Sequence, residues 1–417
     1  MQKVMKQLNI AIVVGYFPTV SETFIVNQIT ALINRGHTVT IYAYKRGKTQ
    51  KIHDNILRYH LLDRVVYKEK PQKELLKRVF TFLKLIYRHL FKLHWSLLFK
   101  SLNFFKYGKK ALTLKVFYNH QFFILNKKFD IVHVHFGTNA VEIADSKSEG
   151  FLGKARFVIS FHGFDINPSK IEFYKVEYKD LFKHAHQITV NTPYTESLLR
   201  QVNPMLSNLH ILPVGLDTEK FKKENKSDKK DGIFKIVFCG RLVSFKGVML
   251  LPVMANELKK RGRNNFKLVV IGEGELKKQL ANKICELNLQ DLFSLLGALK
   301  QEAIIREFET AQLFLLPGIY DEPDGRAENQ GLVIQEAQAM EIPVIVSDVG
   351  GMKYGMIPNK TGYVVKEKDI TAFADTIEYL IKYPEKAKDM GREGRKFVIE
   401  NYDSGKLVDT LVSIYLS

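Results

Sequence analysis

Short apolar runs of strand length alternate with helical patterns along most of the chain, and this alternation constrains the fold more than any other feature. In the first half the runs are LNIAIVV (8–14), HTVTIYAY (37–44), DIVHVHF (130–136), ARFVISF (155–161), HQITVN (186–191) and LHILPV (209–214). In the second half they are IFKIVFCG (233–240), KLVVIGEG (267–274), LFSLLG (292–297), QLFLLPG (312–318) and IPVIVSD (342–348). Strands that alternate with helices form parallel sheets covered by helices. The sequence therefore predicts an α/β fold with doubly wound sheets.

The alternation is interrupted near the middle by DTEKFKKENKSDKKDG (217–232), a charge-rich stretch that is typical of a linker. We therefore expect two Rossmann-like domains facing each other across a cleft, one over residues 1–215 and one over 216–400. The 417 residues suffice for two cores, because a domain commonly contains about 100–200 residues. Residues 401–417 have a helical pattern with no strand after it, so we expect this helix to cross back to the N-terminal domain.

An excess of basic side chains gives the chain a formal net charge of +19, from 63 Lys and Arg against 44 Asp and Glu. This charge favours an anionic partner: a nucleic acid, an acidic lipid surface or a phosphorylated small molecule. Most of the excess lies in 75–129, which contains 12 Lys or Arg and no Asp or Glu. No helix-turn-helix, zinc-finger or RNA-binding pattern accompanies it, so we do not expect a nucleic-acid partner.

This basic segment, an insert at about 73–128, begins with the pattern of an amphipathic helix. At 100° per residue, basic residues fall on one narrow stripe and apolar residues cover the opposite face. The basic residues are Lys77, Lys84, Arg88 and Lys92, and the apolar residues are Leu76, Val79, Phe80, Leu83, Ile86, Tyr87 and Leu90. Such a helix can lie in the interface of an anionic membrane. It can equally pack on its own sheet and leave a basic edge in solvent.

Cysteine usage and hydropathy indicate a reduced compartment without membrane crossing. Cys239 and Cys285 belong to no C-x-x-C or Cys/His cluster, so we expect neither a disulfide framework nor structural zinc. No window approaches the ~18 apolar residues of a spanning helix. The apolar run near the N-terminus lacks the cleavage site of a signal peptide, so we interpret it as a strand. We therefore expect a cytoplasmic protein.

The strongest chemical signal is GRAENQGLVIQEAQAMEIPVIVSDVGG (325–351), in which a loop, a glycine, a helix and a buried strand follow one another. Glu328 lies in the loop, Gly331 opens the helix, and Glu336 lies within its first two turns. The unpaired N–H groups of a helix N-terminus suit a diphosphate, and the carboxylates can accept hydrogen bonds from sugar or ribose hydroxyls. The stretch therefore predicts a site for a ligand that carries both kinds of group.

A second motif, GRLVSFKG (240–247), begins with Gly240 at the end of a predicted strand, where open α/β sheets bind ligands. Arg241 and Lys246 could neutralise a nucleotide diphosphate leaving group, although surface basic residues also occur in such loops. No D-x-D sequence occurs in the chain. We therefore expect no metal at the diphosphate, its place being taken by the two cations and the helix N-terminus.

Two motifs of the first half also lie where predicted strands end. In SFHGFD (160–165), His162 could hydrogen-bond a sugar or an acceptor hydroxyl. In VGYFPTVSETF (14–24), Gly15 and Glu22 could touch the acceptor or the donor phosphate if they face the second domain. Alone, the first motif also fits a structural histidine, and the second also fits a capped turn.

Taken together, GRLVSFKG, IGEGELKKQL and the stretch from Glu328 to Glu336 with Gly350-Gly351 resemble the retaining glycosyltransferases of family 4, which have the two-domain GT-B fold. GYFPTVSETFIVNQITALINRGHTV, DIVHVHFG and FHGFD resemble more specifically the branch that builds bacterial exopolysaccharides and capsules, of the colanic acid and amylovoran type. The resemblance covers nearly the whole chain except about 50–128.

The resemblance implies transfer of a sugar from a nucleotide-sugar, such as a UDP-sugar, to a saccharide acceptor with retention at the anomeric carbon. It implies no metal and no other cofactor. The leaving phosphate would deprotonate the acceptor on the same face, so catalysis would consist of charge stabilisation and positioning. With the basic insert, it further implies a polyprenyl-diphosphate-linked acceptor and a peripheral position on the inner face of the cell membrane, during surface polysaccharide assembly.

The resemblance also implies individual roles. Arg241 and Lys246 would bind the donor diphosphate, Glu328 would contact the donor sugar, and His162 would lie beside the reacting sugar. Glu336 would hold the ribose hydroxyls, the amides of Gly331 and Leu332 would support the phosphate, and Gly15 would lie near the phosphates. We also expect Glu22, Gly240, Asn329 and Gln330, which lie in the same motifs, among the donor-binding or substrate-binding residues.

The sequence departs from the family pattern at two places. The family usually has Gly directly after the first acid, whereas Asn329 and Gln330 follow Glu328 here. Tyr354 stands where a Glu is common, and Lys353 replaces the usual Pro. These departures leave two alternatives open: a catalytically degenerate nucleotide-sugar-binding partner subunit, and a nucleotide-sugar epimerase of the GT-B fold.

Overall fold

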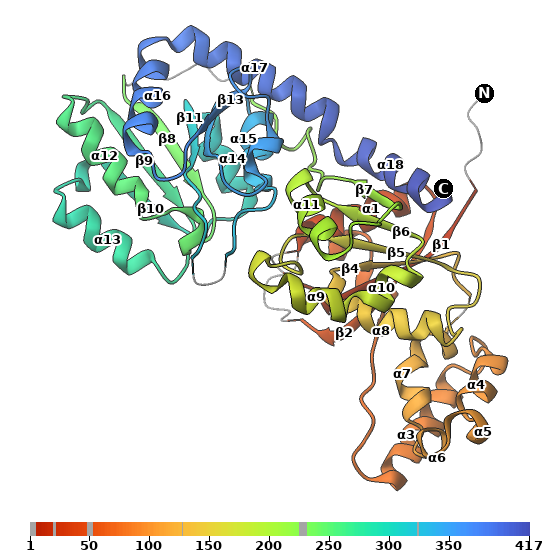
Figure 1. The fold of residues 1–417 in the computed structure, drawn as a ribbon. Helices are drawn as coiled ribbons and strands as arrows, with labels where there is room; N and C mark the ends of the chain where they lie inside the picture. Colours follow the sequence, from red (N-terminus) through yellow and green to blue (C-terminus); the bar gives the residue numbers. More distant parts are fainter. Residues whose placement is uncertain (1–5, 20–21, 48–52, 127, 225–231, 323–324) are drawn as a thin grey trace.

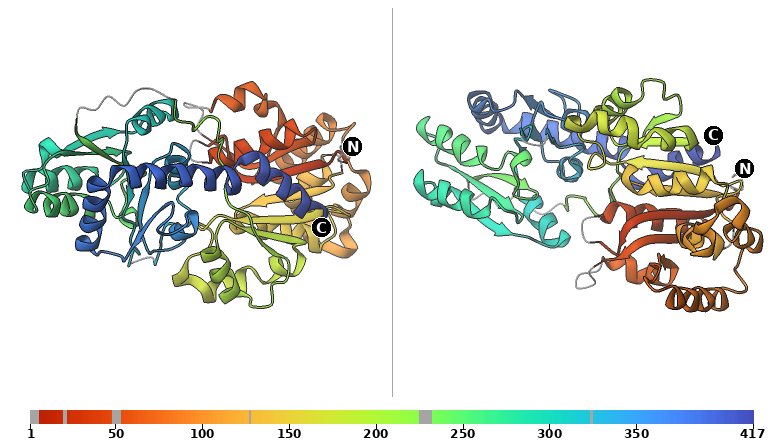
Figure 2. Two further views of the ribbon diagram at one scale, coloured as in Figure 1. Left: turned by 90° about the horizontal axis from the view of Figure 1, so that it is seen from above. Right: turned by 60° about the horizontal axis from the view of Figure 1, so that its bottom comes forward.

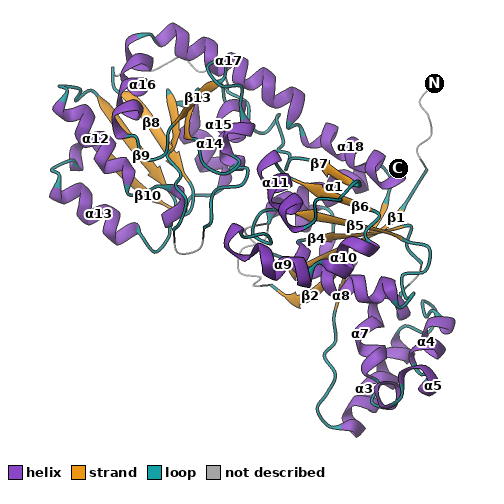
Figure 3. Ribbon diagram, viewed as in Figure 1, coloured by secondary structure: helices purple, strands orange, loops and turns teal. Residues whose placement is uncertain are grey.

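The structure, a computed structural model, describes residues 6–19, 22–47, 53–126, 128–224, 232–322 and 325–417. The chain forms two α/β lobes, each built around one parallel sheet, and a group of helices projects from the N-terminal lobe (Figures 1 and 3). The prediction of an α/β fold with two doubly wound, Rossmann-like sheets is confirmed.

The N-terminal sheet has the strand order β3-β2-β1-β4-β5-β6-β7. Its strands are β1 (Asn9–Phe17), β2 (Thr38–Arg46), β3 (Val65–Tyr67), β4 (Ile131–His135), β5 (Arg156–Phe161), β6 (Gln187–Val190) and β7 (Leu209–Ile211). Its helices outside the insert are α1 (Thr23–Asn34), α2 (Asp54–Arg58), α8 (Gly137–Ser148), α9 (Ile171–Glu177), α10 (Lys179–His184) and α11 (Pro193–Val202). Ala11 and Val13 of β1 join the core that contains α8, while Ile10, Ile12 and Val14 join the core that contains α1. Because both faces are buried, the strand is a continuous apolar run in the sequence.

The C-terminal sheet has the order β10-β9-β8-β11-β12-β13. Its strands are β8 (Phe234–Cys239), β9 (Phe266–Ile271), β10 (Phe293–Gly297), β11 (Leu313–Leu316), β12 (Val344–Ser347) and β13 (Gly362–Val365). Its helices are α12 (Leu250–Lys260), α13 (Lys277–Glu286), α14 (Gln301–Glu309), α15 (Leu332–Ala339), α16 (Ile370–Lys382) and α17 (Pro384–Asn401). One apolar core unites this sheet with its helices.

Two edge strands, β3 and β13, were not among the predicted runs. Each is three or four residues long and lies at the outside of its sheet. All three residues of β3 are partly exposed, as are Tyr363 and Val364 of β13. A short strand with half-exposed residues gives neither a long apolar run nor a clear alternation, so the sequence pattern missed both.

The strand order of each sheet reverses beside its first strand, between β1 and β4 in one sheet and between β8 and β11 in the other. At such a switch point the loops after neighbouring strands diverge and leave a crevice in which α/β proteins bind ligands. Gly15 lies near the end of β1, and Gly240 directly follows β8. The predicted motifs thus lie at both switch points.

The last helix, α18 (Ser404–Leu416), packs on the N-terminal domain although α17 before it packs on the C-terminal domain (Figure 2). Val408, Leu411 and Tyr415 are buried in the same core as α1. The hydroxyl of Tyr415 contacts Nδ1 of His133 over 2.7 Å, and the guanidinium of Arg156 donates to the Tyr415 carbonyl over 2.9 Å. The helix therefore completes one face of the N-terminal domain and ties the two domains together.

The basic insert folds as α3 (Leu75–Arg88), α4 (Trp95–Ser101), α5 (Phe104–Tyr107), α6 (Lys109–Leu112) and α7 (Lys115–Ile124), and it projects from the N-terminal lobe (Figure 1). Helix α7 is buried against the domain, whereas α3 buries only Leu85 completely. Most of the apolar face predicted for α3 is exposed to solvent instead of being packed on the sheet. No helix within the described ranges is long and apolar enough to cross a membrane.

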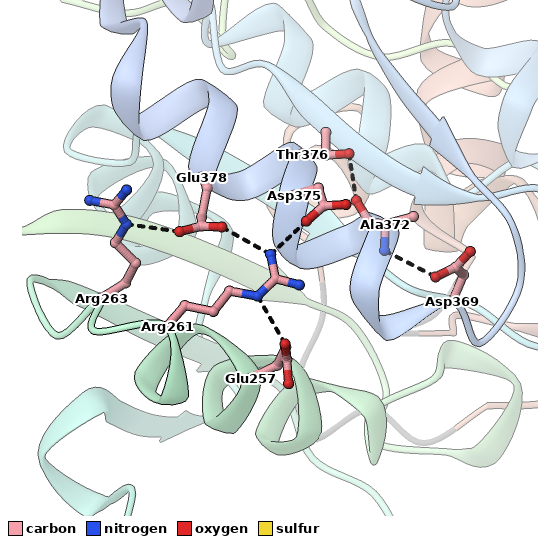
Figure 4. Close-up of polar contacts among 8 residues, drawn as sticks. All are labelled: Glu257, Arg261, Arg263, Asp369, Ala372, Asp375, Thr376 and Glu378. Atoms are coloured by element: carbon pink, nitrogen blue, oxygen red, sulfur yellow. Dashed lines mark hydrogen bonds and ion pairs between the residues drawn. The ribbon is translucent and has the colours of Figure 1, made fainter.

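A network of charged side chains joins α12 to α16 in the C-terminal domain (Figure 4). The Arg261 guanidinium contacts Glu257, Asp375 and Glu378 over 2.6–2.9 Å, and Arg263 also contacts Glu378. The two guanidinium groups hold the pKa of Glu378 below its ordinary value. The network contains none of the predicted site residues, and it joins the end of α12 to α16.

Candidate active site

Lys246 and Glu328 form a largely buried ion pair at the carboxyl edge of the C-terminal sheet. Lys246 ends the short 3-10 helix η3 (Ser244–Lys246) after β8, and its Nζ atom contacts Oε2 of Glu328. Only 12% and 14% of the two side chains are exposed. The other carboxylate oxygen of Glu328 accepts a hydrogen bond from the Gly331 N–H over 3.1 Å. The structure therefore brings together the cation, the carboxylate and the helix N-terminus that three separate positions of the sequence supply.

The Gly350-Gly351 pair allows the loop around Glu328 to lie directly on the turn after β12. A Cβ atom at Gly350 would lie 2.1 Å from the Glu328 carbonyl oxygen, and one at Gly351 would lie 1.8 Å from the Asn329 carbonyl oxygen. The Gly351 N–H donates to the Glu328 carbonyl over 2.9 Å. Side chains at these positions would push the loop, and Glu328 with it, away from Lys246.

Glu336 lies on α15, whose first residue is Leu332 and whose N-cap is Gly331. Burial raises the pKa of the Glu336 carboxyl to about 7, with the charge of Lys220 opposing the shift. Burial and, secondarily, the Glu336 charge raise the pKa of the Cys239 thiol to about 12. Because Cys239 ends β8, Glu336 lies at the same sheet edge as Gly240.

Arg241 is exposed next to this centre. Its guanidinium carbon lies 5.8 Å from the centre of the Phe245 ring, and Nζ of Lys246 lies 5.9 Å from the same ring. The two cations therefore flank one aromatic side chain on the loop after β8. Lys246 is held by Glu328, whereas Arg241 extends into solvent.

His162 follows β5 in the N-terminal domain, and protein groups occupy both of its ring nitrogens. Nδ1 contacts Oδ1 of Asn191 over 3.1 Å, and Nε2 contacts Nδ1 of His135 over 2.9 Å. Phe24 packs on the imidazole with the ring centres 4.8 Å apart. Burial lowers the pKa of His162 to about 4, so the ring is neutral near pH 7. In this arrangement the ring is fixed in place and uncharged, and neither of its nitrogens is free to bind a substrate.

Asp165 is a site-forming residue for which the sequence suggested no role. Its carboxylate accepts hydrogen bonds from the N–H groups of Gly137, His162 and Gly163 over 2.7–3.0 Å. Burial raises its pKa to about 6, while these hydrogen bonds oppose the rise. The signal available in the sequence was an acid four residues after a strand end, where a short side chain can accept hydrogen bonds from its own turn.

Gly15 and Glu22 lie on the segment from β1 to α1. A Cβ atom at Gly15 would lie 3.3 Å from the Asn139 side chain. Glu22 precedes α1, and burial raises the pKa of its carboxyl, with a hydrogen bond from Thr19 opposing. Phe24 places this segment beside His162. Among the described residues, the contacts of this segment are made within the N-terminal domain.

Asn329 and Gln330 connect the two domains through their amide side chains. Oδ1 of Asn329 accepts from the hydroxyls of Thr192 and Thr195, and its Nδ2 donates to the His162 carbonyl over 2.9 Å. The amide of Gln330 accepts from the Val214 N–H over 2.7 Å and donates to the Val214 carbonyl over 2.8 Å. The two residues that depart from the family pattern therefore join the loop of Glu328 to the N-terminal domain.

Metal ligands are not gathered in the described part of the chain. Within it, no group of three or more His, Cys, Asp or Glu side chains is arranged to hold a metal ion. The charged groups that the site does offer to a diphosphate are Lys246 and Arg241, together with the N-terminus of α15.

Comparisons with known proteins agree with this geometry. Residues 21–220 match the family model "Glycosyltransferase Family 4", and residues 217–397 match the model "Glycosyl transferases group 1". The chain is a family 4 glycosyltransferase. The resemblance inferred from the motifs is therefore confirmed, and the protein is an enzyme of this class.

Curated relatives share most of the length of this glycosyltransferase. The colanic acid biosynthesis glycosyltransferase WcaL of Salmonella typhimurium is 28% identical over 86% of this chain and 87% of its own length. The amylovoran biosynthesis glycosyltransferase AmsK of Erwinia amylovora is 29% identical over the same shares. An Escherichia coli UDP-Gal:α-D-GlcNAc-diphosphoundecaprenol α-1,3-galactosyltransferase is 26% identical over 70% of this chain and 76% of its own.

Among solved structures, Anabaena HepE in complex with UDP superposes with a TM-score of 0.72 at 14% identity, over 97% of this chain and 99% of that one. A likeness at this identity concerns the fold, and it assigns the glycosyltransferase to the two-domain GT-B architecture.

Proposed function

We propose that this glycosyltransferase transfers a sugar from a nucleotide-sugar, with retention and without a metal, to a lipid-linked saccharide acceptor during assembly of a bacterial surface polysaccharide. The observation that carries the proposal is the Lys246–Glu328 ion pair beside the N-terminus of α15. A positive side chain and unpaired helix N–H groups at a sheet switch point together form a site for a diphosphate.

The donor would lie along the carboxyl edge of the C-terminal sheet. The diphosphate would contact Lys246, Arg241 and the amides of Gly331 and Leu332, while Glu336 would accept hydrogen bonds from the ribose hydroxyls. Glu328 is held by Lys246 and Gly331 with little freedom, so it can accept from a sugar hydroxyl at a fixed place. Groups fixed before the donor arrives stabilise the negative charge of the leaving diphosphate without rearranging during the reaction.

The transfer itself needs no protein base in this proposal. The bond between the anomeric carbon and the diphosphate oxygen breaks, and an acceptor hydroxyl oxygen bonds to the same face of that carbon. The leaving phosphate oxygen takes the proton of the acceptor hydroxyl. A neutral His162 with both ring nitrogens occupied is compatible with a role in shaping the sugar site and does not act as a base.

The names of relatives support the acceptor class. Two of them belong to the biosynthesis of exopolysaccharides, and one is named for a diphosphoundecaprenol-linked sugar. Such an acceptor lies in a membrane, and we propose a peripheral position on its cytoplasmic face. In this proposal the anionic partner of the basic insert is a lipid surface and not a nucleic acid.

A nucleoside diphosphate is expected to stabilise the protein against heat, and EDTA is expected to leave this effect unchanged. A ligand at 100 times its dissociation constant stabilises the folded state by about 2.7 kcal/mol, which is readily seen in a thermal-shift measurement. UDP, GDP, ADP and dTDP are compared, with UDP as the first choice. Glu336→Ala should lose most of the shift, because it lacks the acceptor for the ribose hydroxyls.

The matched control is Glu286→Ala, since Glu286 makes an exposed ion pair on α13. It should keep the full shift. Absence of a shift with all four nucleotides, or a shift that EDTA removes, contradicts the proposed donor site. Incubation of the preferred nucleotide-sugar with and without a lipid-linked acceptor, followed by NMR of the product, then establishes transfer and the anomeric configuration.

Binding of the nucleotide-sugar is expected to tighten as the pH rises from 6 to 8. The pKa of Glu336 is about 7 in the folded protein without ligand, and hydroxyl groups donate to its carboxylate form. Below pH 7 the proton must be released before those bonds form, which weakens binding; above pH 7 that cost disappears. Isothermal titration across this range measures the slope. Glu336→Gln should bind more weakly with little dependence on pH, and an unchanged slope in this variant contradicts the assignment.

A further inference from the structure

Helix α3 of the insert presents an apolar face to solvent. Leu76, Phe80, Leu83 and Tyr87 are 85%, 71%, 57% and 84% exposed. At 100° per residue these four side chains, here called the outer face, lie within an arc of roughly 60°. Leu85, the completely buried residue of the helix, lies on the opposite side. The helix is therefore held to the insert on one side and carries an uncovered apolar strip on the other.

Basic side chains of α3 lie beside the outer face. Lys77, Lys84 and Arg88 border the outer face on one flank, where Lys77 contacts Glu74 over 2.9 Å in an exposed ion pair. The sequence from Leu75 to Phe129 has no acidic residue. Beyond α3, Phe91 of the following turn, Phe99 of α4 and Phe105 of α5 are 98%, 66% and 100% exposed, so other parts of the insert also expose apolar side chains. An exposed apolar helix face bordered by cationic side chains is typical of an interaction site.

The positive charge of this surface favours an anionic membrane over a protein as its binding partner. A protein partner of ordinary composition would leave Lys84 and Arg88 of this flank without acidic partners unless it were itself strongly acidic. An anionic bilayer provides phosphate groups for the flank and an acyl boundary for the outer face at the same time. Aromatic and lysine side chains suit this boundary, because each has an apolar body and a polar tip.

We propose that the outer face of α3 docks on an anionic lipid bilayer, with Leu76, Phe80, Leu83 and Tyr87 in the headgroup boundary and Lys77, Lys84 and Arg88 on lipid phosphates. The helix then lies parallel to the membrane surface and does not cross it. This inference deepens the proposed function, on which it rests for the lipid-linked acceptor. The docking surface itself is remote in sequence from the donor residues and can be tested without transfer.

Vesicle binding of the full-length protein tests the proposal. Vesicles of phosphatidylcholine and phosphatidylglycerol, and vesicles of phosphatidylcholine alone, are compared in flotation assays. Trp95, the single tryptophan of the chain, lies at the start of α4 and is 48% exposed, so its fluorescence reports on the insert. We expect at least about 10-fold tighter binding to the anionic vesicles, since each Lys or Arg adds about 1 kcal/mol near such a surface. A shift of Trp95 emission to shorter wavelength should accompany binding.

Two variants separate the contributions. Phe80→Ser/Leu83→Ser should weaken binding to anionic vesicles about 10-fold or more, and Lys77→Ala/Lys84→Ala/Arg88→Ala should remove the preference for anionic lipid. The matched control is Val176→Ser/Met205→Ser, which changes two residues that are 79% and 86% exposed outside the insert. It should bind vesicles like the wild type. These substitutions are at exposed positions, and unchanged melting temperatures verify the fold.

Three results would overturn the inference: no binding of the wild type to anionic vesicles, equal binding of the Phe80→Ser/Leu83→Ser variant, or a self-associated protein whose dimer this variant dissolves. The last result would assign the outer face to a second copy of the chain. The nucleotide-induced thermal shift should be the same in wild type and in both insert variants. Loss of vesicle binding with a retained shift therefore separates failure of docking from failure of the proposed transferase function.

Discussion

Lys246→Ala is expected to lower kcat/KM for sugar transfer by about 10²–10³-fold, the size of effect that follows loss of one fixed electrostatic contact to a leaving group. The Lys246 ammonium is largely buried and is directed by Glu328, so water or a neighbouring side chain cannot replace it without rearrangement. Arg241 remains, but it is exposed and held by no carboxylate described here. Initial rates with the nucleotide-sugar identified by thermal shift measure the effect.

The variant must be distinguished from one that is simply unfolded. Removing Lys246 leaves the Glu328 carboxylate buried without a cation, which can cost about 3–5 kcal/mol of folding free energy. Lys246→Ala/Glu328→Gln removes both charges, while the amide oxygen can still accept from Gly331. The double variant should recover the unfolding midpoint in urea but not the activity.

Lys283→Ala serves as the control for Lys246→Ala, because Lys283 makes an exposed ion pair with Glu286 on α13. It should retain wild-type kinetics. Recovery of activity together with stability in Lys246→Ala/Glu328→Gln would contradict a direct role of Lys246 at the diphosphate, since the ion pair would then matter only for folding.

The sequence predicted the fold well because both faces of each sheet are covered. A buried parallel strand such as β1 or β12 is a continuous apolar run, and that run is visible without any knowledge of its neighbours. The half-exposed edge strands β3 and β13 lack this property and were missed. For α3 the periodicity gave the angular positions of its side chains, but it could not tell which side meets the protein, since that depends on where α7 lies.

The site was predictable as far as it depends on strand ends. Gly240, Lys246 and Glu328 each follow a strand of one sheet, and strand ends of a parallel sheet meet at one edge. The ion pair between Lys246 and Glu328 was not predicted, because strand order and loop path decide which side chains touch. The two partners of the His162 ring, Asn191 and His135, come from neighbouring strands and were missed for the same reason.

Contacts between the domains are the feature that a sequence pattern predicts least well. Asn329 and Gln330 were predicted to bind the donor because they follow Glu328 in the same loop, and the structure gives their side chains partners in the N-terminal domain. In the sequence, Asn329 and Gln330 stand between Glu328 and Gly331, which are joined by a hydrogen bond. We therefore expect a change in the domain contact to shift the loop that carries Glu328.

Asn329→Ala is therefore expected to reduce kcat by about 10–100-fold while nucleotide binding changes by less than about 3-fold. The amide makes three hydrogen bonds across the cleft, to Thr192, Thr195 and the His162 carbonyl, and each is worth about 0.5–1.5 kcal/mol. Without them the domain arrangement that these bonds hold is populated less, whereas the donor contacts of the C-terminal domain stay intact. Steady-state kinetics and nucleotide titrations measure the two quantities, and small-angle scattering with bound nucleotide measures the opening.

A second variant decides whether Asn329 acts through the domain contact or by touching the donor. Thr192→Val/Thr195→Val removes two of the same hydrogen bonds from the N-terminal side and changes nothing on the donor loop. If the amide positions the domains, this variant should reproduce most of the loss in kcat. If it binds the donor, Thr192→Val/Thr195→Val should be nearly as active as the wild type and Asn329→Ala should weaken nucleotide-sugar binding. Asn34→Ala, which removes an exposed amide contact to Tyr59 on the N-terminal domain, should leave both quantities unchanged.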